Sequence, residues 1–77
     1  MERNIKLIWD FHGPDAQHFA EHHAIHLKEF AAKENLSLNE TSSSKEADNY
    51  WIAWMIVPES EMIKVRDALK PHRGVLA

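Results

Sequence analysis

The stretch Tyr50-Trp51-Ile52-Ala53-Trp54-Met55-Ile56-Val57 decides the fold, because every position in it is apolar or aromatic. Successive residues of a strand point to opposite faces of a sheet, so this stretch carries apolar side chains on both faces. Such strands are typical of the middle of a sheet, where both faces are covered. We therefore predict a central strand over residues 50–57, ended by Pro58.

A second strand is predicted over residues 4–11, where the hydropathy alternates. Ile5, Leu7, Trp9 and Phe11 share one face of this strand, and Lys6, Ile8 and Asp10 share the other. Gly13 and Pro14 interrupt the alternation. Because proline suits the first turn of a helix, a helix is expected to begin near Pro14.

Residues 16–34 show the period of an amphipathic helix. Its predicted core-facing stripe consists of Ala16, Phe19, Ala20, His23, Leu27, Phe30 and Ala31. Asn35 is the predicted stop. Residues 36–41 are then expected to form a short strand, and the polar residues 42–48 a loop.

A second helix is predicted after Pro58, with the Ser60 hydroxyl as a capping group. Met62, Val65 and Leu69 form its buried stripe, and Pro71 and Gly74 close it. Residues 75–77 are too few to assign from the sequence.

The predicted order β-α-β-β-α describes one small α+β domain over residues 1–77. The compact arrangement of these elements is a two-layer sandwich with both helices on one face of an antiparallel sheet. The third strand then lies between the first and the second. This architecture is ferredoxin-like, with the fourth strand missing or very short.

Composition excludes several classes of function. Nine basic and twelve acidic residues give a net charge of −3, which argues against a nucleic-acid binder. The absence of cysteine excludes disulfides and thiolate metal sites. No segment is apolar enough for a signal peptide or a membrane span, so a cytoplasmic location is expected.

Histidines are the most unusual feature of the sequence, which contains six of them. Several stand four residues apart in the first predicted helix, a spacing that can chelate a divalent metal. Chain direction brings the end of the first strand and the end of the second helix to the same edge. The resulting candidate metal ligands, for an ion such as zinc, are Asp10, His12, His18, His22 and His72. The alternative is that these histidines are solvated or packed, and no other cofactor is expected.

Lys70 and Arg73 form a second candidate site, for a phosphate or carboxylate ligand near the start of the first helix. The simpler interpretation is that both cations complement the dipole at the end of the second helix. Catalysis is not favoured, because no nucleophile turn or glycine-rich phosphate loop is present, and no catalytic residue is assigned.

The apolar faces of the sheet support a third hypothesis. Two helices on one face leave the other face uncovered, and exposed apolar patches commonly mark interfaces. We therefore expect a self-associating binding or regulatory module, in the form of a homodimer. The contact would use the uncovered sheet face, or the edge of the first strand, with Ile8, Trp51 and Trp54 as interface residues. The histidine-based site, with a catalytic role as an option, is the alternative function.

Overall fold

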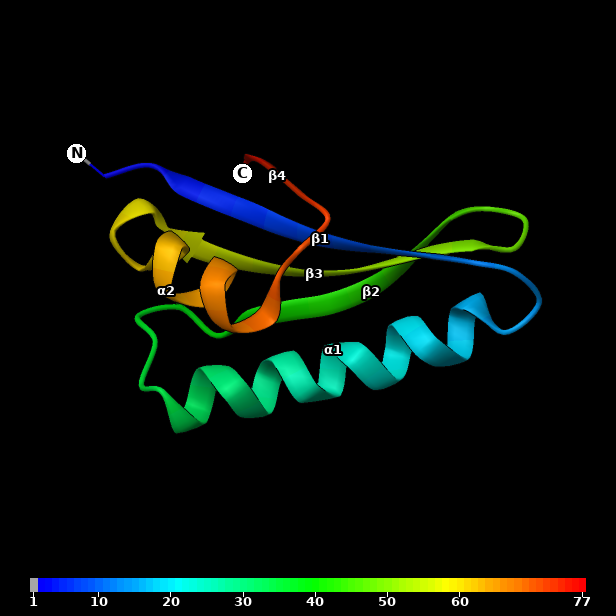
Figure 1. Cartoon of the computed structure of the whole chain (residues 1–77), viewed down its shortest axis with the longest axis horizontal. Helices are drawn as coiled ribbons and strands as arrows, with labels where there is room; N and C mark the ends of the chain where they lie inside the picture. Colours follow the sequence, from blue (N-terminus) through cyan, green and yellow to red (C-terminus); the bar gives the residue numbers. More distant parts are fainter. Residues whose placement is uncertain (1) are drawn as a thin grey trace.

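The computed structural model describes residues 2–77 as a four-stranded antiparallel sheet with two helices (Figure 1). The elements are β1 (Asn4–His12), α1 (Ala16–Lys33), β2 (Glu40–Ala47), β3 (Tyr50–Pro58), α2 (Glu59–Leu69) and β4 (Arg73–Leu76). The strand order is β2-β3-β1-β4, so β3 lies between β1 and β2. The sequence analysis correctly predicts a small α+β domain with an antiparallel sheet.

The hydrophobic core lies between the helices and one face of the sheet. Its buried members are Leu7, Trp9, Leu27, Ala31, Ala53, Met55, Val57 and Val65, drawn from two strands and both helices. The Trp9 indole Nε1 also donates a 3.0 Å hydrogen bond to the carbonyl oxygen of Leu69. This bond fixes the end of α2 to β1 and satisfies a carbonyl group that a helix end leaves without a partner.

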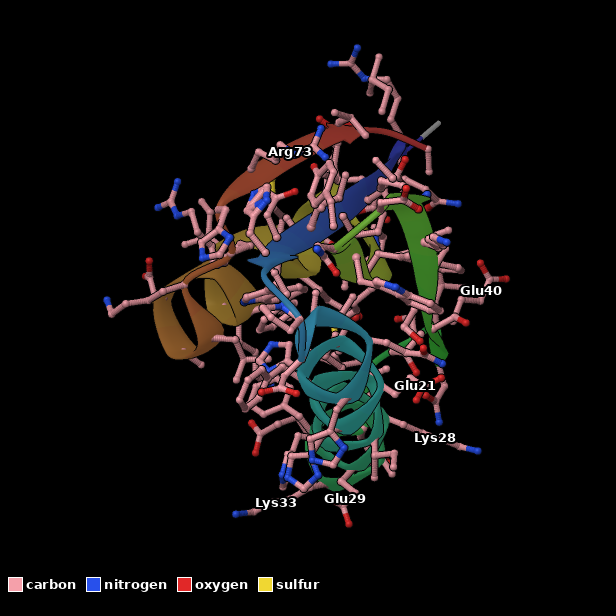
Figure 2. All side chains as sticks on the ribbon, turned by 90° about the vertical axis from the view of Figure 1, so that its right-hand side faces the viewer. Glu21, Lys28, Glu29, Lys33, Glu40 and Arg73 are labelled. Carbon is pink, nitrogen blue, oxygen red and sulfur yellow. The ribbon has the colours of Figure 1, made fainter. Side chains whose placement is uncertain are left out.

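The same face carries both helices, as Figure 2 shows with α1 seen end-on below the sheet and α2 beside it. Because paired residues of neighbouring strands point to the same side, the register defines the opposite face, which we call the outer face. Lys6, Ile8 and Asp10 of β1, Tyr50, Ile52, Trp54 and Ile56 of β3, and Glu40, Ser42 and Ser44 of β2 belong to it. The uncovered face predicted from the sequence is therefore present within residues 2–77.

The polar segment 42–48 was expected to be a loop, and this expectation is wrong. Residues 40–47 form β2, which pairs with β3 from Glu40↔Ile56 to Ala47↔Tyr50. Serine and threonine suit this position because β2 is the outermost strand and is largely exposed to water. The strand turns back through Asp48 and Asn49, and Asn49 adopts a left-handed conformation with φ of 57°.

Both helices differ in detail from the predictions. Phe19 is exposed instead of buried, because it lies about 90° around α1 from the centre of the stripe formed by Ala20 and Leu27. The Ser60 hydroxyl makes no capping bond at the start of α2. Its main-chain N–H instead donates a 2.6 Å hydrogen bond to Oε1 of Glu2. A carboxylate from the N-terminal segment therefore caps this helix.

β4 answers the question that the sequence left open about residues 75–77. Val75 and Leu76 belong to this four-residue strand, which pairs with β1 from Ile5↔Leu76 to Ile8↔Arg73. The strand is very short, but it pairs with the edge of β1 that does not face β3. The edge of the first strand, proposed above as a contact surface, is consequently occupied over these residues.

Candidate functional site

Two aliphatic side chains are buried at the centre of the outer face, although no helix of the described residues covers them. Ile8 is 4% exposed and Ile52 is 2% exposed. Ile8 lies in register between Trp54 and Arg73, and Ile52 lies between Asp10 and Ser44. Burial therefore comes from the flanking side chains of the same sheet. Trp54 and Ile56 on the same face are half-buried and keep part of their surface accessible.

One of these flanking contacts is a cation–π interaction. The Lys6 ammonium lies 4.8 Å from the centroid of the Trp54 ring. This contact links a charged side chain of β1 to an aromatic side chain of β3 on the outer face. Ile8 and Trp54, two of the three predicted interface residues, thus lie on the outer face. Trp51, the third predicted interface residue, points to the helix side and is excluded from this face.

A network of polar side chains, formed by Asp10, Tyr50 and Arg73, lies on the outer face at the end of β1. The Tyr50 hydroxyl donates a 2.6 Å hydrogen bond to Oδ1 of Asp10. Arg73 donates from Nη2 to Oδ1 of Asp10 at 3.2 Å, and from Nε to Oδ2 at 3.3 Å. Its Nη2 also donates to the Tyr50 oxygen at 3.3 Å. Three strands, β1, β3 and β4, are joined by these three side chains.

The network shifts the ionisation of its members. Burial acts to raise the pKa of Asp10, but the hydrogen bonds from Tyr50 and Arg73 outweigh it, and the pKa lies below its ordinary value. The hydrogen bond to Asp10 raises the pKa of Tyr50, since loss of the phenolic proton would place two anions in contact. Asp10 is therefore held as a carboxylate and Tyr50 as a phenol. Because three donors already engage this carboxylate, it is an anchor for the strands more than a free acid or base.

Two histidines flank this network. Nδ1 of His72 accepts a 2.8 Å hydrogen bond from the backbone N–H of Asp10, and the His72 N–H donates to the Ile8 carbonyl at 2.9 Å. The His12 ring stacks on Tyr50 with centroids 4.4 Å apart. The end of β1, the start of β3 and the segment before β4 thus meet, as chain direction predicted.

The five predicted metal ligands are not brought together. Asp10, His12 and His72 lie around the Tyr50 network, whereas His18 and His22 lie on α1. In residues 2–77 no three histidine, aspartate or glutamate side chains converge as a metal-binding group. Of the two residues of the predicted anion site, Arg73 is already engaged by Asp10 and Tyr50. Lys70 ends α2 with its backbone in a left-handed conformation.

On α1 the histidines form a row of their own. Nε2 of His22 and Nε2 of His26 are 2.9 Å apart, and Nδ1 of His26 lies 3.3 Å from Oε1 of Glu29. The rings of His18 and His22 are more distant, with centroids 6.3 Å apart. His22 and His26 therefore form the close pair of this row.

His23 faces the other way, into the core. Its ring packs against Trp9 and Phe11 with centroid separations of 5.1 and 5.6 Å. Its buried Nε2 has no hydrogen-bond partner among the described residues. Burial lowers the pKa of His23, with the neighbouring histidines 26, 72 and 22 acting in the same direction. His23 is therefore a half-buried residue packed against the core, and burial favours its neutral form.

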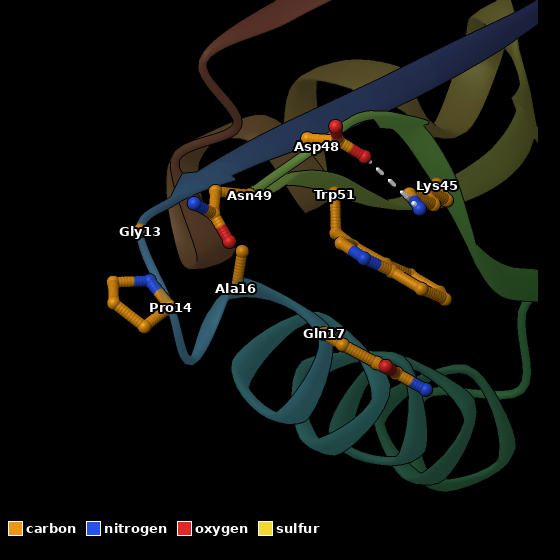
Figure 3. Close-up of a pocket in the computed structure, with 8 residues that line it drawn as sticks. All are labelled: Gly13, Pro14, Ala16, Gln17, Lys45, Asp48, Asn49 and Trp51. Atoms are coloured by element: carbon orange, nitrogen blue, oxygen red, sulfur yellow. Dashed lines mark ion pairs between the residues drawn. The ribbon is translucent and has the colours of Figure 1, made fainter.

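A hollow of about 390 Å³ lies between the turn after β2 and the start of α1 (Figure 3). The Trp51 ring forms one wall, and Gln17 of α1 lies opposite. Lys45 and Asp48 at the rim form an ion pair at 3.4 Å. An aromatic wall with polar neighbours is typical of small-molecule sites, but these charged groups already satisfy each other.

Comparison with known proteins identified no relative, since no family model, no curated protein and no solved structure matches the chain. Neither helix in residues 2–77 has the length and apolar character needed to cross a membrane.

Sequence reasoning missed two residues of these sites, Tyr50 and His26. Chain direction placed Tyr50 at the same end of the fold as Asp10, but Tyr50 was not named as a site residue, and its hydroxyl bonds to an aspartate 40 positions away. His26 was noted for its spacing, but it was left out of the ligand set. The i, i+4 spacing was sufficient to pair it with His22.

Proposed function

We propose that this chain is a ferredoxin-like binding module that forms a homodimer through its outer face. The observation that carries the proposal is the apolar cluster there, in which Ile8 and Ile52 are buried and Trp54 and Ile56 are half-buried. The strand order and the placement of both helices on one face support the ferredoxin-like topology.

The arrangement of charges on the outer face favours a second copy as the partner. Ile56 lies in register between Lys6 of β1 and Glu40 of β2. A twofold axis along β3 would place Lys6 of each copy opposite Glu40 of the other. It would also bring Trp54 against Trp54 and Ile56 against Ile56, as an isologous interface requires. One face thus offers both the apolar centre and self-complementary charges.

Sedimentation velocity over a range of micromolar concentrations tests this proposal. The chain has a mass of 9.0 kDa, so a dimer would have twice that mass. Ile56→Lys should give the monomer mass, because it places two buried cations at the twofold axis. Ile25→Lys is the matched control, since Ile25 is exposed on α1, away from the sheet. A wild-type monomer at every concentration would overturn the proposal.

Charge reversal tests the axis itself. Lys6→Glu should weaken the dimer through repulsion of Glu40, and the double variant Lys6→Glu with Glu40→Lys should restore it. If the double variant is as weak as the single variant, then the proposed axis is wrong. Circular dichroism of each variant verifies the fold.

A further inference from the structure

We infer that His22 and His26 form a two-histidine binding site for a divalent transition metal on the solvent side of α1, with Glu29 positioning His26. The site is separate from the outer face and does not depend on the proposed dimer. It also differs from the ligand set predicted from the sequence, because only His22 belongs to both.

The separation of the two ring nitrogens fits a shared metal. The Nε2 atoms of His22 and His26 are 2.9 Å apart. Two ligands in adjacent positions of a six-coordinate or square-planar metal, each at about 2.1 Å, lie about 3.0 Å from one another. A metal would therefore replace the contact between the two nitrogens with almost no change in their positions.

Glu29 prepares the second imidazole for this role. Its Oε1 lies 3.3 Å from Nδ1 of His26, the nitrogen that does not face His22. A carboxylate on this side favours a proton on Nδ1, which leaves the lone pair on Nε2 for the metal. Carboxylates that hold the distal nitrogen of a ligating histidine in this way are a common feature of metal sites. Glu29 is a positioning residue in this proposal, not a ligand.

The helix supplies the rigidity that a two-ligand site needs. α1 is 18 residues long, and the buried Leu27 and Ala31 fix it to the sheet near the site. The i, i+4 spacing is thus held by the backbone before any metal arrives. Both histidines are exposed, so an ion reaches them without opening the fold. Figure 2 places Glu29 on the side of α1 away from the sheet.

The chemistry of the ligands defines the class of metal. Neutral imidazole nitrogens suit Cu²⁺, Ni²⁺ and Zn²⁺, whereas Mg²⁺ and Ca²⁺ prefer oxygen ligands. With two protein ligands, water would fill the remaining positions. Affinity should therefore rise from Ni²⁺ to Cu²⁺, in the order expected for nitrogen sites.

The test is calorimetric titration of the tag-free full chain with Ni²⁺ at slightly alkaline pH. One ion should bind per chain, and His22→Gln or His26→Gln should each weaken binding by at least about tenfold. Glu29→Gln should weaken binding by about tenfold, which a merely structural glutamate on an exposed helix surface would not do. The matched control is His18→Gln, one turn earlier on the same helix, with affinity unchanged. Ni²⁺ should also raise the unfolding midpoint of the wild type and not that of His26→Gln.

Nuclear magnetic resonance gives the position of the ion independently. Paramagnetic Ni²⁺ should broaden the amide signals of residues 22–29 first. Broadening centred on His12 and His72, or on His18, would overturn the assignment. So would an affinity that is the same in His26→Gln as in the wild type. Performing the titration on the Ile56→Lys variant separates this site from the dimer, because metal binding should survive the loss of self-association.

Discussion

The imidazole of His72 accepts a hydrogen bond from the backbone N–H of Asp10 at 2.8 Å. The side chain thereby takes the place of a carbonyl group of a neighbouring strand. The main-chain N–H of His72 donates a hydrogen bond to the carbonyl oxygen of Ile8, which precedes Asp10 by two residues on β1. His72 therefore pairs with two main-chain groups of β1, the Ile8 carbonyl and the Asp10 N–H. It does so immediately before β4 begins at Arg73. The ladder along β1 is extended by a side chain where the main chain of β4 has not yet started.

This relationship predicts a local change in His72→Ala. The Asp10 amide would lose its acceptor, so its hydrogen exchange should accelerate by about tenfold or more. The amide of Leu7, in the middle of β1, is the internal reference and should be affected much less. Residue-resolved exchange measures both. Equal acceleration at the two amides would contradict a role specific to Asp10.

Tyr50→Phe tests the phenol in the polar network. The substitution removes the 2.6 Å hydrogen bond to Asp10 and leaves the ring in place. We expect a measurable fall in the free energy of unfolding, because the Asp10 carboxylate loses one of its hydrogen-bond donors. Urea denaturation gives this value. Ser44→Ala, on the same face but in the exposed strand β2, should change the stability by less than about 0.5 kcal/mol.

Asp10 should also determine part of the stability in acid. Its pKa in the folded state lies below the ordinary value of 3.8, so the folded state favours the carboxylate. The corresponding stabilisation is present above pH 3.8 and is lost as the pH falls through the folded-state pKa. Asp10→Asn should therefore be less stable at neutral pH and show a smaller further loss below pH 3.8. Parallel pH profiles of wild type and variant would contradict this expectation.

His23 should act in a higher pH range. Its pKa is lowered from the ordinary value of 6.5, since burial disfavours the imidazolium. The unfolded chain therefore binds the proton first, and the folded state loses stability as the pH falls below 6.5. His23→Leu should remove this slope between pH 6.5 and 5, as measured by thermal unfolding. The exposed His18→Gln is the control and should keep it.

A pair of residues on α1 tests the position of the core. Leu27 is 1% exposed and Ile25 is 59% exposed. Leu27→Ala should cost about 2–5 kcal/mol, because it removes buried surface and leaves a cavity. Ile25→Ala should change the stability by about 0.5 kcal/mol or less. Chemical denaturation of both variants decides whether α1 packs through the face described above.

The strands with strong hydropathy patterns could be predicted from the sequence. Residues 50–57 are apolar on both faces, and β3 indeed has neighbours on both sides. The strand predicted over residues 36–41 coincides with β2 only at residues 40 and 41, and residues 42–47 of β2 were mistaken for a loop. The serines of β2 carry no hydrophobic pattern, and its strand conformation depends on pairing with β3. Local patterns cannot report such pairing, since it involves residues distant in the chain.

The candidate sites likewise divide into contacts set by local spacing, which the sequence reveals, and contacts between distant residues, which it does not. The His22–His26 pair arises from local helix geometry, so its spacing is visible in the sequence. The Asp10–Arg73 contact joins residues 63 positions apart, and its geometry requires the register of β4 on β1. Sequence reasoning brought Asp10 and Arg73 to the same end of the fold. It could not predict that Arg73 and Asp10 would pair with each other instead of binding a ligand.

The two edge strands, β2 and β4, determine whether another sheet can add to this one. β2 is polar except for Ala47 and has an irregular register between Lys45 and Ala47, two features that discourage a foreign strand from adding to a sheet. β4 is short and exposed, with Val75 and Leu76 at its end. A fibril needs two receptive edges in every molecule, and this sheet offers at most one. Strand addition at the edges of the sheet therefore cannot extend in both directions from one molecule.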